Sequence, residues 1–214
     1  MPSRRRVLEN FGLDVLGLLK ARNDLDEAAT DDFAPVVVIP VHIETLETMQ
    51  FRDYYIECAA AIDEKRRRQV LFEIMGVTDE TPSVLIVKAI SYLRPYCREI
   101  IVRTRIEARN LHLLKEIGVH TVGADLANLP FREVEWFPMV NEFNERAANA
   151  RLTTFAHGLR TRSGVSGAVA AGFRYLDGRI IATPIEKPLP NRPWTARDVY
   201  SSLITELHAG ADPE

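Results

Sequence analysis

Short apolar runs alternate with longer amphipathic segments along most of the chain, and this alternation restricts the fold more than any other feature. The first run, residues 36–41, is all valine and isoleucine except for Pro40, which is typical of a strand buried on both faces. Further apolar runs lie at residues 70–74, 100–102, 121–124, 152–156, 173–176 and 180–182. Helical segments are expected at residues 46–65, 82–93, 108–117, 134–150 and 163–171. This succession predicts βαβ units and a parallel sheet.

The two ends of the chain differ from this repeating part. Leu8, Phe11, Val15 and Leu18 have helical spacing, so residues 7–19 are expected to form a helix. The acidic residues 23–32 are expected to form a loop, and residues 189–193 are a proline-rich break before a last helix at 195–207. We therefore expect one domain over residues 1–214. Its parts are an N-terminal helix and loop (1–34), the βα repeats (35–188) and a C-terminal helix and tail (189–214).

Charge and composition exclude several classes of function. The net charge of −3 gives no electrostatic case for binding nucleic acid. No apolar run approaches the roughly 18 residues of a membrane span, and the segment after the basic N-terminus is interrupted by polar residues, unlike a signal peptide. Cys58 and Cys97 lack the spacing of a zinc or redox motif. Reduced thiols in a cytoplasmic protein are the expectation.

Periodicity alone leaves two α/β architectures open, a closed barrel and an open doubly wound sheet. Neither a G-x-G-x-x-G nor a G-x-x-x-x-G-K-[ST] motif is present, which removes the commonest nucleotide-binding signatures of open sheets. The stretch from Phe155 to Thr161 reads as the end of a buried strand followed by a sharp turn and a helix. Polar groups at such a strand end are where a parallel barrel places its chemistry.

That stretch, continued through Leu176-Asp177-Gly178 to Thr183-Pro184, resembles without a gap the closing segment of the EAL family, the bacterial cyclic-di-GMP phosphodiesterase domains. The family writes it roughly as AEGVET, a helix, then QG and a final proline. His157 stands where the resemblance implies a catalytic glutamate, Arg160 where it implies a second glutamate, and Asp177 where it implies the glutamine.

The resemblance extends from about Leu8 to Pro188 and implies an α/β fold, an incomplete (β/α)8 TIM-type barrel, EAL-like. The family's first strand, with its Glu-Ala-Leu motif, has no counterpart. Two carboxylates that the family uses are kept, Glu73 and Asp125. Other family positions are replaced. Pro40 stands for the metal-binding asparagine, and Gly76 for the second glutamate of the motif that begins at Glu73. Arg103 and Thr104 stand for paired aspartates, and Gly123 for the catalytic lysine.

These replacements leave three interpretations of the barrel mouth. In the one we prefer, Glu73 and Asp125 pair with Arg103, Arg105 or Arg160, so that no catalytic residue and no cofactor is expected. Alternatively, Glu73, Asp125 and His157 hold a metal, with Mg²⁺ or Mn²⁺ needed for residual activity. In the third, arginines at the strand ends, including Arg162, hold a phosphate. The candidate ligand-binding residues are Arg103, Arg160, Asp125, His157 and Glu73.

The predicted function is that of a catalytically inactive EAL-like signalling or regulatory module acting by protein–protein interaction. One alternative is non-hydrolysing binding of cyclic-di-GMP or another phosphate ligand, and a second is residual cyclic-di-GMP phosphodiesterase activity. The missing first strand would leave residues 36–41 at an open sheet edge, where unpaired backbone groups are unfavourable. We therefore expect a protein partner or a second copy of the chain, with the N-terminal helix or the edge strand in the interface.

Overall fold

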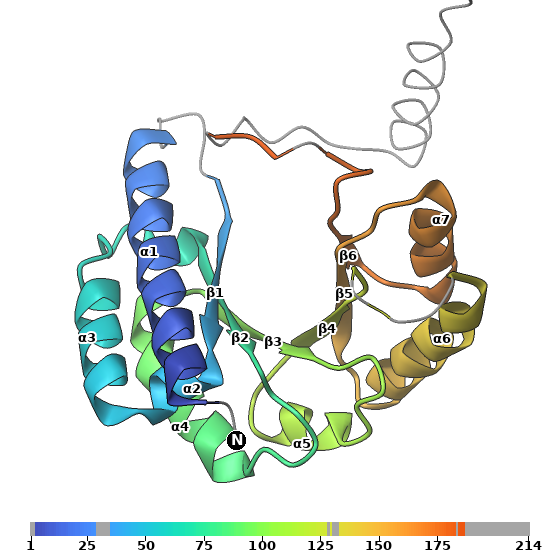
Figure 1. Ribbon diagram of the computed structural model, residues 1–214, viewed down its shortest axis with the longest axis horizontal. Helices are drawn as coiled ribbons and strands as arrows, with labels where there is room; N and C mark the ends of the chain where they lie inside the picture. Colours follow the sequence, from blue (N-terminus) through green and yellow to red (C-terminus); the bar gives the residue numbers. More distant parts are fainter. Residues whose placement is uncertain (1–2, 29–34, 128, 130–132, 183, 187–214) are drawn as a thin grey trace, which may run out of the picture.

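A six-stranded parallel sheet lies at the centre of the molecule, in the strand order β1–β2–β3–β4–β5–β6 (Figure 1). The computed structural model describes residues 3–28, 35–127, 129, 133–182 and 184–186. The strands are β1 (Val37–His42), β2 (Val70–Met75), β3 (Glu99–Thr104), β4 (Thr121–Asp125), β5 (Thr153–His157) and β6 (Tyr175–Leu176). Every strand pairs with its neighbour in the sequence, whereas the strand order of a doubly wound sheet reverses at a switch point. This order and the curl of the sheet confirm the incomplete TIM-type barrel.

Helices line the convex side of the curled sheet (Figure 1). They are α1 (Arg4–Ala28), α2 (Ile43–Glu47), α3 (Met49–Ala60), α4 (Ser83–Leu93), α5 (Leu111–Glu116), α6 (Glu133–Asn149) and α7 (Arg162–Ala171), with short 3₁₀ turns at η1 (Arg67–Gln69) and η2 (Arg94–Tyr96). Alternate strand residues such as Ile39, Val41, Phe72 and Ile74 are fully buried under this layer. Burial of this apolar surface holds the helices on the sheet.

The helix that follows the candidate site has clear signals at both ends. The side chain of Thr161 accepts a hydrogen bond from the backbone N–H of Gly164, which caps the start of α7. Gly172 ends the helix with a φ of 94°, a left-handed conformation that glycine adopts without strain. These two residues fix where the chain leaves β5 and where it enters β6.

The predicted burial of the first strand on both faces is wrong. Ile39 and Val41 are fully buried, but Val38, which projects from the opposite face, is 42% exposed. That opposite face is the concave side of the sheet, which a closed barrel would fill with side chains from strands across the axis. Here the curled sheet leaves it open.

Several element bounds also differ from the prediction. Helix α1 continues to Ala28, through the expected loop, because Ala21 and Leu25 extend its buried stripe. The expected helix at 46–65 is divided into α2 and α3 at Thr48. Residues 179–181 form a turn where a strand was expected at 180–182. The break at 189–193, the last helix at 195–207, the tail and Thr183 lie outside the described residues.

Helix α1 packs beside β1, the strand at one edge of the sheet (Figure 1). Its Asp14 carboxylate is buried and accepts hydrogen bonds from the backbone N–H of His42 at 3.0 Å and from the hydroxyl of Thr45 at 2.6 Å. Nδ1 of His42 lies 2.8 Å from the same carboxylate. These contacts fix α1 to the carboxyl end of β1. None of the described helices combines the length and apolar character that crossing a membrane requires.

Candidate functional site

Four predicted site residues project from adjacent strands onto the concave face, near the carboxyl ends of the strands. In the parallel register Arg103 aligns with Gly123, and Asp125 aligns with His157. On β2, Glu73 lies two residues before Met75, the last residue of the strand, and Met75 aligns with His42 at the end of β1. Because aligned positions in a parallel sheet share a face, the register gathers Glu73, Arg103, Asp125 and His157 into one cluster.

The guanidinium of Arg103 lies between the two retained carboxylates. Its Nε donates a hydrogen bond to Oε1 of Glu73 at 2.6 Å, and its Nη1 is 3.6 Å from Oδ2 of Asp125. The side chain of Glu73 is only 3% exposed, so its charge depends on such partners rather than on water. The expected ion pair between Glu73 and Arg103 is present.

His157 joins this cluster to a third carboxylate. Its Nε2 is 3.2 Å from Oε1 of Glu73, and its Nδ1 is 2.8 Å from Oδ2 of Asp177. Burial of the imidazole disfavours its charged form, but the contacts with Asp177 and Glu73 outweigh this and raise the pKa of His157 to about 9. The imidazole is therefore cationic at neutral pH, and the cluster holds two cations among three carboxylates.

The carboxylates respond in the opposite direction. The hydrogen bond from His157 is the largest cause of the lowered pKa of Asp177. Burial opposes ionisation of Glu73, yet His157 and Arg103 together lower the pKa of that carboxyl. Glu73 and Asp177 are thus expected to be charged at neutral pH. The resemblance places Asp177 in the barrel mouth, but the candidate ligand set does not include it. The gap-free alignment from Gly158 to Asp177 is the sequence signal that points to this residue.

Phe155 fills the space above Gly123, the position that matches the family's catalytic lysine. A Cβ added to Gly123 would overlap the ring of Phe155, which is itself only 3% exposed. The ring centroid of Phe155 lies 4.8 Å from that of His157. An apolar ring therefore occupies the floor of the mouth where a lysine chain would have to emerge.

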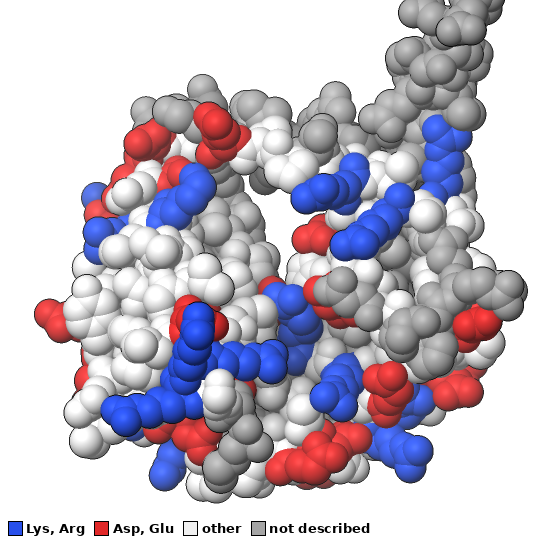
Figure 2. Space-filling model, in the orientation of Figure 1, with Lys and Arg blue, Asp and Glu red and all other residues white. Residues whose placement is uncertain are grey.

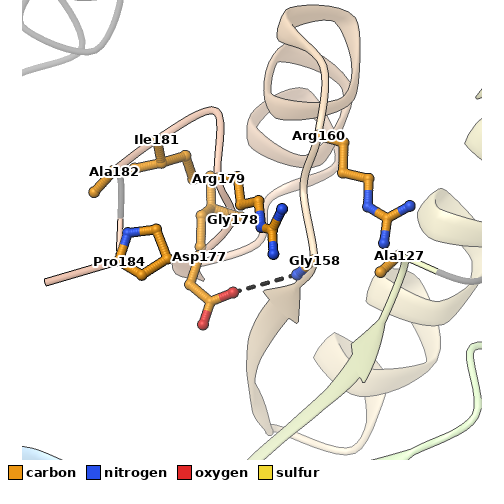
Figure 3. Close-up of a pocket in the computed structure, with 10 residues that line it drawn as sticks. Ala127, Gly158, Arg160, Asp177, Gly178, Arg179, Ile181, Ala182 and Pro184 are labelled. Carbon is orange, nitrogen blue, oxygen red and sulfur yellow. Dashed lines mark hydrogen bonds between the residues drawn. The ribbon is translucent and has the colours of Figure 1, made fainter.

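Arg160 lies apart from the cluster, in an adjoining pocket of about 460 Å³. Arg160 and Arg179 both line this pocket. Figure 3 shows the backbone N–H of Gly158 donating a hydrogen bond to Asp177, another lining residue, so Asp177 belongs to both the cluster and the pocket. The other lining residues are Ala127, Leu176 of β6 and residues of the segment that follows β6.

The charges around the open side of the sheet are mixed. Figure 2 shows basic and acidic side chains next to one another around the hollow in the middle of the view. Within the part of the chain that the structure describes, no three His, Cys, Asp or Glu side chains are grouped so that they could hold a metal ion. Since Arg103 separates Glu73 from Asp125 and His157 is cationic, the geometry does not favour the metal-binding alternative.

No protein-family model matches the sequence, and no curated protein matches it. Solved structures do match. The S helix–GGDEF–EAL region of Vibrio cholerae LapD bound to c-di-GMP aligns over 80% of this chain with a TM-score of 0.63 and 14% identity. Bacillus subtilis YkuI, with an EAL domain in complex with c-di-GMP and calcium, aligns over 88% with a TM-score of 0.62 and 17% identity. The chain spans 42% and 47% of the lengths of these two chains.

A match to an isolated EAL domain covers more of the other chain. The EAL domain of Mycobacterium smegmatis DcpA aligns over 93% of this chain and 83% of its own length, with a TM-score of 0.54 and 19% identity. At this level of identity the likeness concerns the arrangement of the strands and helices. The chain therefore has an EAL-like fold.

Proposed function

We propose that this chain is a catalytically inactive EAL-like module of bacterial c-di-GMP signalling, which acts in the cytoplasm by binding another protein or a second copy of itself. The position of the Arg103 guanidinium between Glu73 and Asp125 is the observation that carries this proposal. Metal-assisted hydrolysis needs carboxylate oxygens free to coordinate Mg²⁺ or a similar cation. Here a cation would have to displace a guanidinium and approach a positively charged His157.

The absence of a lysine at position 123 supports the same conclusion. Gly123 carries no side chain, and Phe155 closes over it. Position 123 therefore offers no side chain that could act on an attacking water. A substitution of Gly123 could not supply one without moving the ring of Phe155. The cluster instead resembles a salt-bridged polar plug, which keeps the EAL-like frame intact while removing the groups that would perform the chemistry.

A hydrolysis assay tests this proposal directly. The purified chain is incubated with c-di-GMP and either Mg²⁺ or Mn²⁺, and the linear product is quantified by chromatography. We expect no turnover above a protein-free blank. Turnover that disappears in the Glu73→Ala variant would show that the residual-activity alternative is correct and would overturn the proposal.

The adjoining pocket favours a second candidate function, the binding of c-di-GMP or another phosphate ligand without hydrolysis. Arg160 and Arg179 both line the pocket, and guanidinium groups suit phosphate oxygens. Isothermal titration with c-di-GMP, and separately with inorganic phosphate, tests this function. We expect Arg160→Ala to weaken binding at least tenfold and Arg98→Ala, at an exposed arginine just before β3, to leave it unchanged. Equal affinities in the two variants would place any ligand elsewhere.

A further inference from the structure

Helix α1 presents a second apolar face, away from the sheet. Its Leu18, Ala21 and Leu25 are buried. Leu13 and Leu16, in contrast, are 64% and 65% exposed. At about 100° per residue, both leucines lie on the side of the helix opposite Leu18. Leu13 and Leu16 thus give this face of α1 an exposed apolar centre, and the residues around them decide what it could contact.

Two glycines flank these leucines. Among the residues that the structure describes, a Cβ added to Gly12 or Gly17 would meet no atom within 4 Å. Glycine weakens a helix interior relative to alanine, and no described neighbour requires its small size at either position. Glycine on a helix face does, however, allow another backbone to approach closely.

Two ion pairs lie on the same face, one toward each end of the helix. Arg5 and Glu9 are 2.8 Å apart, and Lys20 and Asp24 are also 2.8 Å apart. The side chains of Arg5, Glu9 and Lys20 are more than half exposed. Nζ of Lys20 additionally donates to the carbonyl oxygen of Glu186 at 3.3 Å.

The order of these residues is self-complementary. Read inward from the two ends, the face runs Arg5, Glu9, Gly12, Leu13 on one side and Asp24, Lys20, Gly17, Leu16 on the other. A two-fold axis between Leu13 and Leu16 would place every member of the first series opposite its counterpart in the second. Leucine then meets leucine, glycine meets glycine, and both charged positions meet opposite charges.

We propose that α1 pairs antiparallel with α1 of a second copy of this chain, about a two-fold axis between Leu13 and Leu16. A parallel pairing would oppose Arg5 to Arg5 and Lys20 to Lys20, so the charges select the antiparallel arrangement. The pairing gives the protein-binding role proposed above a defined partner and rests on that role. Figure 1 shows α1 on the side of the sheet opposite β6 and α7.

Charge reversal tests the pairing, because only a self-pairing is restored by reversing both members. Self-association of the full chain is measured by sedimentation equilibrium from about 1 to 200 μM. Each of Glu9→Lys and Lys20→Glu creates two like-charge contacts per dimer and is expected to weaken association at least tenfold. The double variant Glu9→Lys/Lys20→Glu is expected to recover at least half of the lost affinity on a logarithmic scale.

An apolar substitution gives a second, independent arm. Leu13→Lys should abolish dimerisation, whereas Val169→Lys, at a valine of α7 that is 53% exposed, should not. Circular dichroism shows whether each variant is folded; because both positions are exposed, the fold is expected to persist. A wild-type chain that stays monomeric at 200 μM overturns the pairing. A double variant that associates no more tightly than the single variants also overturns it, because binding of a different partner to α1 would not be restored by the second charge reversal.

The outcome is separable from that of the proposed function. A monomer without hydrolysis refutes this pairing and leaves the inactive-module proposal standing. A dimer that hydrolyses c-di-GMP refutes that proposal and leaves the pairing standing.

Discussion

Replacing His157 by glutamine should change the pH dependence of the stability of the chain. In the folded protein the pKa of His157 is about 9, against 6.5 for a free histidine. The folded state therefore binds this proton more tightly than the unfolded state does. A difference of this size corresponds to about 3 kcal/mol of stabilisation when the imidazole is charged.

The sign of the effect follows from the direction of the pKa change. A raised pKa stabilises the fold fully below pH 6.5, and this contribution is lost as the pH rises through 9. On the acid side, the lowered pKa values of Glu73 and Asp177 act oppositely, because their contribution is lost as the pH falls and they become protonated. The cluster should thus stabilise the fold most in weakly acidic to neutral solution.

Urea unfolding of the wild-type chain and of His157→Gln at pH 6 and pH 10 measures this contribution. The difference in unfolding free energy between the two chains should shrink by about 3 kcal/mol between these pH values. Comparing the chains at each pH cancels the titration of groups they share. His112→Gln, at an exposed histidine of α5, is the control for removing an imidazole outside the cluster.

A difference between wild type and His157→Gln that stays constant from pH 6 to pH 10 would refute this reasoning. It would mean that the pKa of His157 is the same in the folded and unfolded states, so that its contacts with the two carboxylates do not favour the charged imidazole. An NMR titration of the imidazole carbons would then place the pKa of His157 near 6.5 rather than near 9.

Three further perturbations test the packing of the mouth and of α1. Arg103→Met should destabilise the fold by about 2–3 kcal/mol in urea, because it leaves the buried Glu73 with one cation fewer; adding Glu73→Gln should recover most of this loss, and strictly additive effects would argue against the pair. Gly123→Ala should lower the unfolding free energy by about 1–3 kcal/mol through overlap with Phe155, and an unchanged urea midpoint would show that the ring moves freely. Gly12→Ala should stabilise the dilute chain by about 0.5–1 kcal/mol through helix propensity, yet weaken self-association in the ultracentrifuge; stronger association would contradict the close approach of two helices.

The sequence determined much of the fold through local patterns. Continuous β-branched runs and helical spacing located the strands and most of the helices, because hydrophobic periodicity reflects which side of an element is buried. The order of the strands in the sequence also predicted that Arg103 lies beside Glu73, because the carboxyl ends of neighbouring parallel strands meet at one edge of the sheet. In these cases the relevant contacts are short in sequence or follow from the order of the strands.

Only the tertiary structure decided how those elements combine. The one-step strand order and the open curl explain why Val38 is exposed, although its neighbours suggested burial on both faces. The partnership of His157 with Asp177, and the ring of Phe155 over Gly123, depend on register across separate strands. A linear pattern does not encode these pairings, because the register and curvature of a sheet are set by the packing of all its strands and helices together.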